Sequence, residues 1–345
     1  MDDEPWSAVL ASSPVPWLLE PEDPAVRART LELLLGRRAD DDDVVAARTT
    51  AMTIDPIAGM LAAQDEAGWW VKPGPGYGPK YSGTVWNLMF LAQLGADASD
   101  ARIQRACEYV MAHTATSSGG FGASGAAGER PPPPSAAIHC LNGNLVHALI
   151  RFGHLYHPVV RAATDWAART ILGEDHDRWY ASGTSGPGFR CAANEAEPCA
   201  WGAVKELRGL AAVPAPLRTD RERRAIDAGI AFLLSCDPAV ADYPMGYGNT
   251  SPSSSWFKAG FPSGYVADVV QNLEVLAALG VAADPRLDRA YAWLVGLADD
   301  TGRWRNRYAY AGKTTVPIDR QGQPSKWVTL RACAVLRSRH RQGSA

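Results

Sequence analysis

The segment VLAALGVAADPRLDRAYAWL, residues Val275–Leu294, determines the fold expected for this chain. Its apolar residues recur three and four positions apart up to Gly280, where a glycine is typical of the C-terminal end of a helix. Asp284 and Pro285 then supply the cap and first turn of a second helix. The segment therefore predicts a helical hairpin with a short link.

The same pattern occurs twice more, in FLAQLGADASDARIQRACEYV (Phe90–Val110) and ALIRFGHLYHPVVRAATDWA (Ala148–Ala167), and a degenerate copy runs from Cys199 to Cys236. Repeated hairpins indicate an all-helical repeat protein without long strands. We predict first helices at 24–37, 81–95, 139–153, 198–212, 264–280 and 325–339, and second helices at 43–64, 99–113, 157–172, 219–235 and 284–298.

The links between these helices alternate in length. Links within a hairpin have roughly 3–6 residues, whereas links between hairpins have roughly 15–30 and are rich in Gly, Pro, Ser and Trp. Because the hairpins are stacked alike, all the long loops should emerge at one rim, together with the N-termini of the first helices. Functional residues are expected on this long-loop rim.

Composition excludes several classes of protein. The 345 residues are 46% hydrophobic and 21% charged, with a net charge of -3. These values argue against a disordered chain and against a nucleic-acid partner. There is no apolar run of about 18 residues, and the N-terminus is acidic, so we expect a cytoplasmic protein that does not span a membrane. Its six cysteines are expected to be reduced.

Three loops carry a glycine followed by an aromatic residue: Gln64–Trp69, Gly119–Gly122 and Asp300–Trp304. This signature resembles the repeat of the terpenoid cyclase and protein prenyltransferase superfamily, the prenyltransferase and squalene oxidase repeat. The resemblance implies an α/α toroid of about six inner helices within an outer ring, with a central cavity open at the long-loop rim. We expect an extension at 1–23, one toroid domain at 24–340 and a tail at 341–345, and Trp69 and Trp304 in structural roles.

The thiols provide one candidate site. Cys140 and Cys199 are predicted at the starts of neighbouring inner helices, with Cys191 in the loop between them. A helix N-terminus lowers the pKa of a thiol, and a thiolate serves as a nucleophile or as a zinc ligand. His139 or His147 is the candidate fourth ligand for Zn²⁺. Buried thiols that only pack remain the alternative.

The acidic residues provide a second candidate. Asp268 is expected near the start of an inner helix, where burial would raise its pKa and suit it to act as an acid. Capping of that helix is the alternative. Glu206 is a further cavity carboxylate, and the two would form the pair required by a sugar-cleaving barrel. Asp40–Asp43 matches the DxDD string of protonating cyclases, but it is expected to cap a helix.

The leading functional hypothesis is an enzyme of the terpenoid cyclase or prenyltransferase type, with a hydrophobic isoprenoid-like substrate in the toroid and its polar head at the rim. The alternatives are a zinc- or thiol-dependent enzyme that activates a sulfur nucleophile, and a non-catalytic toroid that binds a lipid or a protein partner. No nucleotide cofactor is expected, because glycine-rich phosphate loops are absent. The expected catalytic residues are Asp268, Cys140 and Cys199, and the expected substrate-binding residues are Lys80, Tyr81, Trp86, Asn144, His147, Trp201, Glu206, Asn272 and Lys326.

Overall fold

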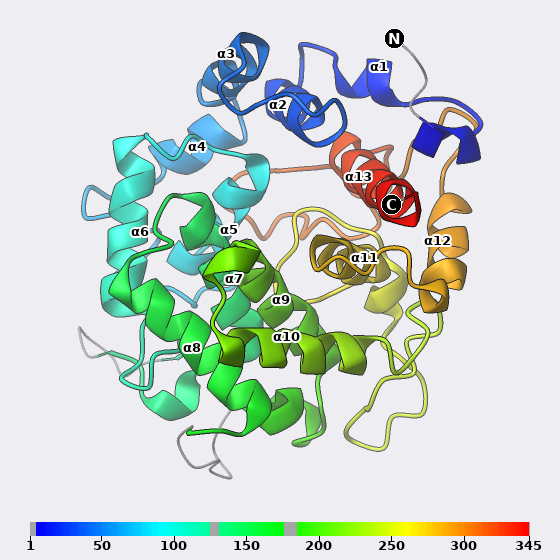
Figure 1. The fold of residues 1–345 in the computed structure, drawn as a ribbon. Helices are drawn as coiled ribbons and strands as arrows, with labels where there is room; N and C mark the ends of the chain where they lie inside the picture. The colour runs from blue at the N-terminus through cyan, green and yellow to red at the C-terminus, as the bar shows by residue number, and fades with distance from the viewer. Residues whose placement is uncertain (1–4, 125–130, 176–184, 345) are drawn as a thin grey trace.

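A computed structural model describes residues 5–124, 131–175 and 185–344. The chain forms two layers of α-helices arranged in a ring (Figure 1). The inner helices are α2 (Pro24–Leu33), α5 (Thr84–Leu94), α7 (His139–Arg151), α9 (Ala200–Ala212), α11 (Val269–Ala278) and α13 (Lys326–Gly343). The outer helices are α3 (Asp42–Ala51), α4 (Ile57–Ala62), α6 (Ala101–His113), α8 (Pro158–Leu172), α10 (Asp220–Leu233) and α12 (Asp288–Val295).

Short elements complete the described chain. They are α1 (Val15–Leu18), the antiparallel strands β1 (Ser185–Gly186) and β2 (Arg190–Cys191), and the 3-10 helices η1 (Pro5–Val9), η2 (Pro134–Ala136), η3 (Pro187–Phe189), η4 (Ala192–Asn194), η5 (Ala215–Leu217), η6 (Ser254–Phe257) and η7 (Pro285–Leu287). The predicted all-α toroid is therefore confirmed. None of the described helices has both the length and the apolar character that crossing a membrane requires.

The inner helices contact one another in chain order from α5 to α13, and α13 contacts α2. Arg29 of α2 lies next to Gly95 at the end of α5, since a Cβ added to this glycine would be 3.0 Å from the Arg29 Cδ. Gly95, Gly153 and Gly280 all have positive φ, as expected at helix ends. The predicted helix 43–64 is instead broken into α3 and α4, because Pro56 cannot continue the first helix.

The glycine-aromatic signature has a local structural cause. The Trp304 indole donates to the Leu294 carbonyl at 2.7 Å, and the Trp304 amide donates to the Thr329 hydroxyl at 2.9 Å. Trp70 makes the same pair of bonds, to Met60 and Thr84, at 2.7 and 3.1 Å.

Trp304 thus has the structural role predicted for it, but the equivalent residue in the first loop is Trp70. The residue predicted for this role, Trp69, stands one position before the indole that anchors the loop. When the two copies of the motif are aligned, Trp70 corresponds to Trp304, and Trp69 corresponds to Arg303. Both anchoring indoles are buried, with 1% of their surface exposed. The motif therefore fixes these two long loops between the end of an outer helix and the start of the next inner helix.

The backbones of α7 and α9 lie against each other. A Cβ on Gly143 would overlap the Lys205 carbonyl, and one on Gly209 would lie 2.8 Å from the Gly143 oxygen. Small residues at a crossing allow this close approach. The inner faces of the two helices consequently form one continuous surface inside the ring.

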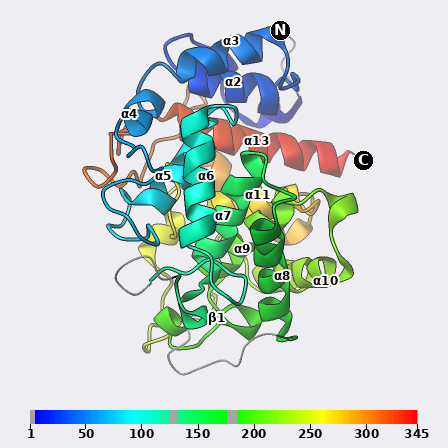
Figure 2. The same ribbon diagram turned by 90° about the vertical axis from the view of Figure 1, so that its left-hand side faces the viewer.

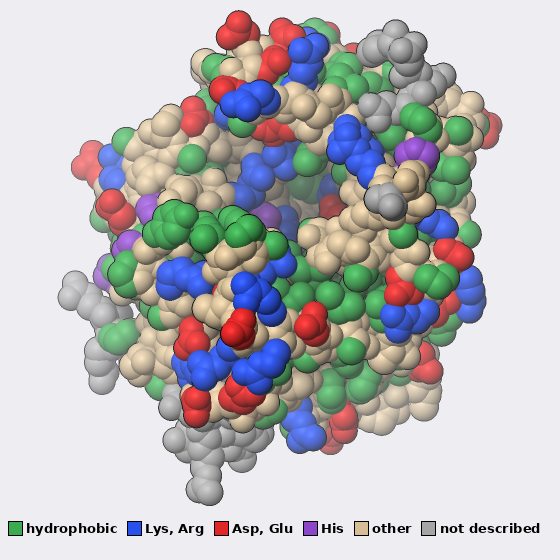
Figure 3. Space-filling view, viewed as in Figure 1, with side chains coloured by type: hydrophobic (Ala, Val, Ile, Leu, Met, Phe, Trp, Pro, Cys, Tyr) green, Lys and Arg blue, Asp and Glu red, His purple; other side chains and the backbone are tan. Residues whose placement is uncertain are grey.

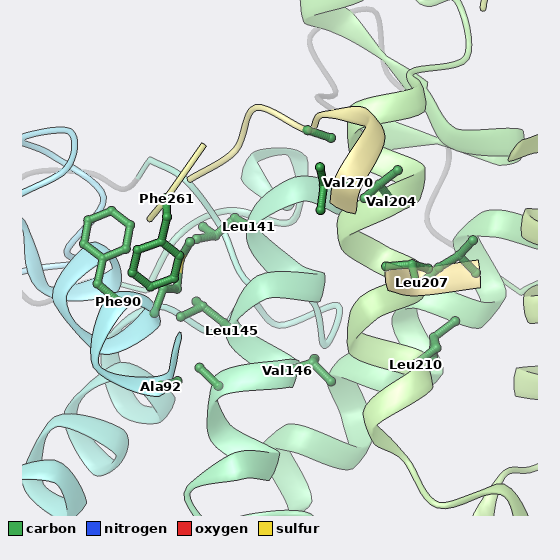
Figure 4. Packing of buried hydrophobic residues seen from close by; sticks show 14 of the residues in the cluster. Phe90, Ala92, Leu141, Leu145, Val146, Val204, Leu207, Leu210, Phe261 and Val270 are labelled. Carbon is green, nitrogen blue, oxygen red and sulfur yellow. The ribbon is translucent and has the colours of Figure 1, made fainter. Parts of the chain in front are cut away.

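The ring is filled from the long-loop rim by the segment that precedes α11. Ser263 exchanges two hydrogen bonds of 2.8 Å with the Gln93 side chain of α5, and the Gly264 oxygen accepts one from Asn144 of α7. Phe261 belongs to the same buried cluster as Phe90 and Leu141 (Figure 4). The central cavity therefore does not open at this rim, contrary to expectation, because a long loop folds inward and occupies it.

The N-terminal extension is packed rather than loose. Trp6 and Leu18 are buried, and η1 and α1 both contact α13. Asp41 caps α3 by accepting from the Asp43 amide, so the acidic run 40–43 has the capping role expected of it. The boundary predicted at residue 23 remains a prediction.

Candidate functional site

A pocket of about 510 Å³ lies at the long-loop rim, where α7 and α9 begin. We call it the rim pocket. The loops before α9 and α11 cover it, and η6 contributes Trp256 to its wall. Most of its lining is apolar, and its large side chains include Phe189, Trp201, Tyr243, Met245, Tyr247, Trp256 and Tyr265. Such a concave, aromatic surface suits an apolar small molecule.

The structure brings the three predicted thiols together in this pocket. Cys140 stands in the first turn of α7, Cys199 is the N-cap of α9 with its sulfur 3.5 Å from the Gly202 amide, and Cys191 ends β2. The repeat predicted this meeting, because adjacent inner helices start side by side.

The pKa values of the thiols differ from those expected from their positions in the helices. A hydrogen bond from the Cys199 thiol lowers the pKa of Cys191 to about 6, and the amides of Ala193 and Asn194 act in the same direction. Burial raises the pKa of Cys140 to about 12. The pKa of Cys199 is also raised, because its thiol donates a hydrogen bond to Cys191 and because it is buried. The expectation that the helix starts lower the pKa of Cys140 and Cys199 was therefore wrong, and the loop thiol Cys191 is the one favoured as a thiolate.

His139 is held from both sides at the pocket wall. Its Nδ1 lies 2.9 Å from Glu206 Oε2 and its Nε2 lies 3.3 Å from the Gly186 oxygen. Glu206 is buried behind it, also accepts 2.7 Å from Asn142, and has a pKa raised by burial. Glu206 therefore positions His139 and does not line the rim pocket.

This arrangement does not fit zinc as the residues stand. Both nitrogens of the candidate ligand His139 are engaged by protein atoms. Across the described ranges, no three His, Cys, Asp or Glu side chains are grouped to hold a metal ion. We derive no chemistry through a metal here, and the predicted zinc ligands Cys140, Cys191, Cys199 and His139 stay a prediction.

The predicted aromatic wall residues form a cluster beside the pocket. The ring of Tyr81 lies 4.3 Å from that of Tyr310 and 5.1 Å from that of Trp86. Both Tyr81 and Trp86 are buried in this packing, whereas Trp201 and Tyr265, 6.3 Å apart, reach the pocket surface. Lys80 Nζ lies 4.8 Å above the Tyr265 ring, a cation–π distance.

Asp268 is the N-cap of α11, which is the alternative to a catalytic role that the sequence suggested for it. Its carboxylate accepts from the Gln271 amide at 2.8 Å and lies 3.9 Å from Arg331. It is 3% exposed, burial raises its pKa, and it does not line the rim pocket. Its predicted catalytic role stays a prediction.

Two other predicted binding residues support loops and helices. Asn272 donates at 3.0 Å to the hydroxyl of Tyr243, which lines the pocket, and so positions that ring. Lys326 pairs with Glu20 at 2.8 Å and Asp23 at 2.6 Å, which joins α13 to the N-terminal extension.

Asn144 and His147 lie further along α7. Asn144 donates to the Cys140 and Gly264 oxygens at 2.9 and 3.2 Å and so holds the inward loop. His147 is a neighbour of Arg151, Lys205 and Arg208 in the ring interior, where burial and these cations lower its pKa well below the usual range.

Sequence reasoning missed the loop residues that form the outer wall of the rim pocket, Tyr243, Met245, Tyr247 and Trp256. No motif marks them, because a loop supplies side chains without periodic spacing. It also missed the arginines and the lysine inside the ring, although their neighbour His147 was a predicted binding residue. Their signal was present in the spacing of His147 and Arg151, and of Lys205 and Arg208, within otherwise apolar helices.

The comparisons with known proteins give a distant fold likeness. No protein-family model and no curated protein matches the chain. Solved structures of the type II terpene cyclase MstE from Scytonema are similar to it. A variant in complex with its product merosterolic acid A is 11% identical, covers 83% of this chain and 95% of that chain, and has a TM-score of 0.32. A second variant without ligand is 13% identical over the same shares, with a TM-score of 0.30. Scores this low support no transfer of activity.

Proposed function

We propose that this chain is an enzyme of the terpenoid cyclase or prenyltransferase type that holds a hydrophobic, isoprenoid-like molecule in the rim pocket. The observation that supports this proposal is the pocket itself, with its volume of about 510 Å³ and its aromatic walls. Small-molecule sites have this size and lining. The faces of Trp201 and Tyr265 suit positive charge that develops on a carbon skeleton.

The substrate would lie at the rim rather than in the centre of the ring. The segment around Ser263 fills the ring below the rim, and the interior beyond it carries charged side chains. Asn249 and Ser251 are exposed lining residues, so the polar head of the molecule would face them and the solvent.

Binding of farnesol, measured by isothermal titration calorimetry, tests this proposal. Farnesol should bind the full chain with one site, and Met245→Trp, which fills the pocket, should weaken binding at least tenfold. Val240→Trp provides the matched control, because Val240 is 40% exposed in the same loop and does not line the pocket. Absence of farnesol binding, or equal binding by the Met245→Trp variant, would contradict the proposal.

The pKa of Cys191 favours a second candidate, a thiol-dependent reaction in the same pocket. Its thiolate would attack an electrophilic carbon of the bound molecule, so that a C–S bond forms while the bond from that carbon to its leaving group breaks and the group departs with the electron pair. Turnover that is lost in Cys191→Ser while farnesol binding persists would support this function. A toroid that only carries lipid would bind farnesol without any dependence on Cys191. Metal analysis of the purified chain tests the zinc-dependent version.

A further inference from the structure

The interior of the ring, away from the rim pocket, carries a cluster of basic side chains. On α7, Asn144, His147 and Arg151 follow one another at spacings of three and four, and on α9 Lys205 and Arg208 are three apart. Such spacing places residues on one face of a helix. Because the backbones of α7 and α9 touch at Gly143 and Gly209, the two basic faces are adjacent.

Other inner helices add further cations to this cluster. His147 has Arg29 of α2 among its charged neighbours, and Arg208 has Arg331 of α13. Figures 1 and 2 show that α13 ends on the face turned toward the viewer in Figure 1. Figure 3 shows that face hollowed at its centre, with Lys, Arg and His side chains around the hollow. We call the cluster of cations the central chamber and define it by residues that are charged neighbours of one another: Arg29, His147, Arg151, Lys205, Arg208 and Arg331.

The acids near the chamber are Glu32, Glu274 and Asp268, which lies 3.9 Å from Arg331, and they are fewer than its cations. Glu32 pairs with Arg29 at 2.5 Å and with Arg48 at 2.7 Å. Glu274 pairs with Arg331 at 2.7 Å through two nitrogens of the guanidinium. These two carboxylates are therefore already engaged by cations.

Glu32 acts electrostatically on Arg151 and Glu274 on Arg208, but within the described chain neither carboxylate forms an ion pair with these two arginines. Among the described residues, neither guanidinium has an ion pair or a hydrogen bond. Repulsion by Arg29 is the main cause that lowers the pKa of Arg151, whose side chain is exposed, to about 9, and burial is the main cause that lowers that of Arg208 to about 10. Lys205 is fully buried and donates a hydrogen bond to the Gln271 side chain, and its pKa is lowered to about 7 by burial and then by Arg208.

The helix dipole accounts for Arg151, which ends α7, but not for the other cations of the cluster. The negative end of a helix favours cations only within its last turn. Lys205 lies well before the end of α9 at Ala212, and Arg331 lies near the beginning of α13, where the dipole disfavours a cation. Mutual repulsion in a confined, solvent-reached space costs free energy, and an anion bound there would offset this cost.

We propose that the central chamber binds an oxyanion of the phosphate type with at least two negative charges, held by the forked guanidinium groups of Arg151 and Arg208. Planar guanidinium groups match phosphate oxygens in pairs. The anion would enter from the face shown in Figure 3, opposite the rim pocket, so this site does not rest on the proposed function. Free diphosphate and the phosphate group of a lipid headgroup share this chemistry.

Isothermal titration calorimetry with inorganic diphosphate, at fixed ionic strength, tests the proposal. Diphosphate should bind the full chain, and Arg151→Gln and Arg208→Gln should each weaken its binding at least tenfold. Arg208→Lys should weaken it less, because the charge remains without the fork. Arg223→Gln on α10 is the matched control, since Arg223 is exposed and already paired with Asp220, and it should bind diphosphate like the unaltered chain.

A stability measurement separates binding from a structural role. Arg151→Gln and Arg208→Gln should unfold at the same temperature as the unaltered chain or a higher one, because each removes repulsion. Glycerol phosphate, titrated in parallel, represents a lipid headgroup, and whichever probe binds more tightly identifies the source. The proposal is overturned if neither probe binds beyond the effect of KCl at equal ionic strength, or if both Gln variants bind diphosphate normally.

Discussion

The pKa of Cys191 shows how a residue's chemistry depends on contacts that sequence does not contain. The repeat predicted where Cys140 and Cys199 lie, at the starts of two inner helices, and the structure places them there. It did not predict that the Cys199 thiol would meet Cys191 across the loop and donate to it. Burial outweighs the helix start at Cys140, so the reactive thiol could not be chosen from helix position alone.

We predict that alkylation of Cys191 by iodoacetamide is half-maximal near pH 6. The thiolate reacts, and a lowered pKa means that the thiolate already forms above about pH 6 instead of about pH 9. Cys199→Ala removes the donated hydrogen bond and should move the midpoint toward higher pH, whereas Cys140→Ala should leave it unchanged. Peptide mass spectrometry of the site over a pH series measures this midpoint. A midpoint near pH 9 in the unaltered chain would contradict the assigned contact.

At the level of elements, periodicity predicted the helices well because an apolar stripe and a terminal glycine are local properties. Errors arose where a local stop was overlooked, as at Pro56 between α3 and α4, or where tertiary contacts determine a helix start, as at Asp268 of α11. The helices α7 and α9 were expected to be neighbours, but the close approach of their backbones was not predicted. Nothing in the local sequence of α7 explains why residue 143 is a glycine. The explanation is the backbone of α9, far along the chain, which leaves no room for a side chain at Gly143.

Gly143→Ala should destabilise the chain by about 2 kcal/mol. Alanine in a helix gains about 1 kcal/mol over glycine, but an added methyl group in a packed interface costs about 3 kcal/mol, and here it meets backbone that cannot rotate away. Urea unfolding followed by circular dichroism measures the change. Gly296→Ala is the control, because Gly296 ends α12 with φ −64° and its nearest atoms would lie at 3.3 Å or more. Equal effects of the two substitutions would refute the close packing of α7 on α9.

At the scale of the whole molecule, the repeat predicted a ring but not how the ring is filled. Hairpin stacking fixes which ends of the helices meet, so the location of the rim pocket followed from the sequence. The direction in which a long loop folds depends on partners such as Gln93 and Asn144, which lie far from Ser263 and Gly264 in the chain. This inward loop separates an apolar pocket at one face from a basic chamber at the other. The local sequence pattern does not predict this separation of an apolar pocket from a basic chamber.

The N-terminal extension packs on α13 and α2, and we expect the toroid to depend on it. Deletion of residues 1–23 would remove the buried side chains of Trp6 and Leu18 from α13, and the Lys326 partners Glu20 and Asp23 with them. Loss of one buried Trp alone costs about 3–5 kcal/mol, so the free energy of unfolding should fall by at least about 3 kcal/mol. Urea unfolding of the shortened chain measures this, with a chain ending at Gly343 as the control for truncation at an exposed terminus. An unchanged midpoint would mean that residues 1–23 are dispensable to a toroid that is complete from residue 24.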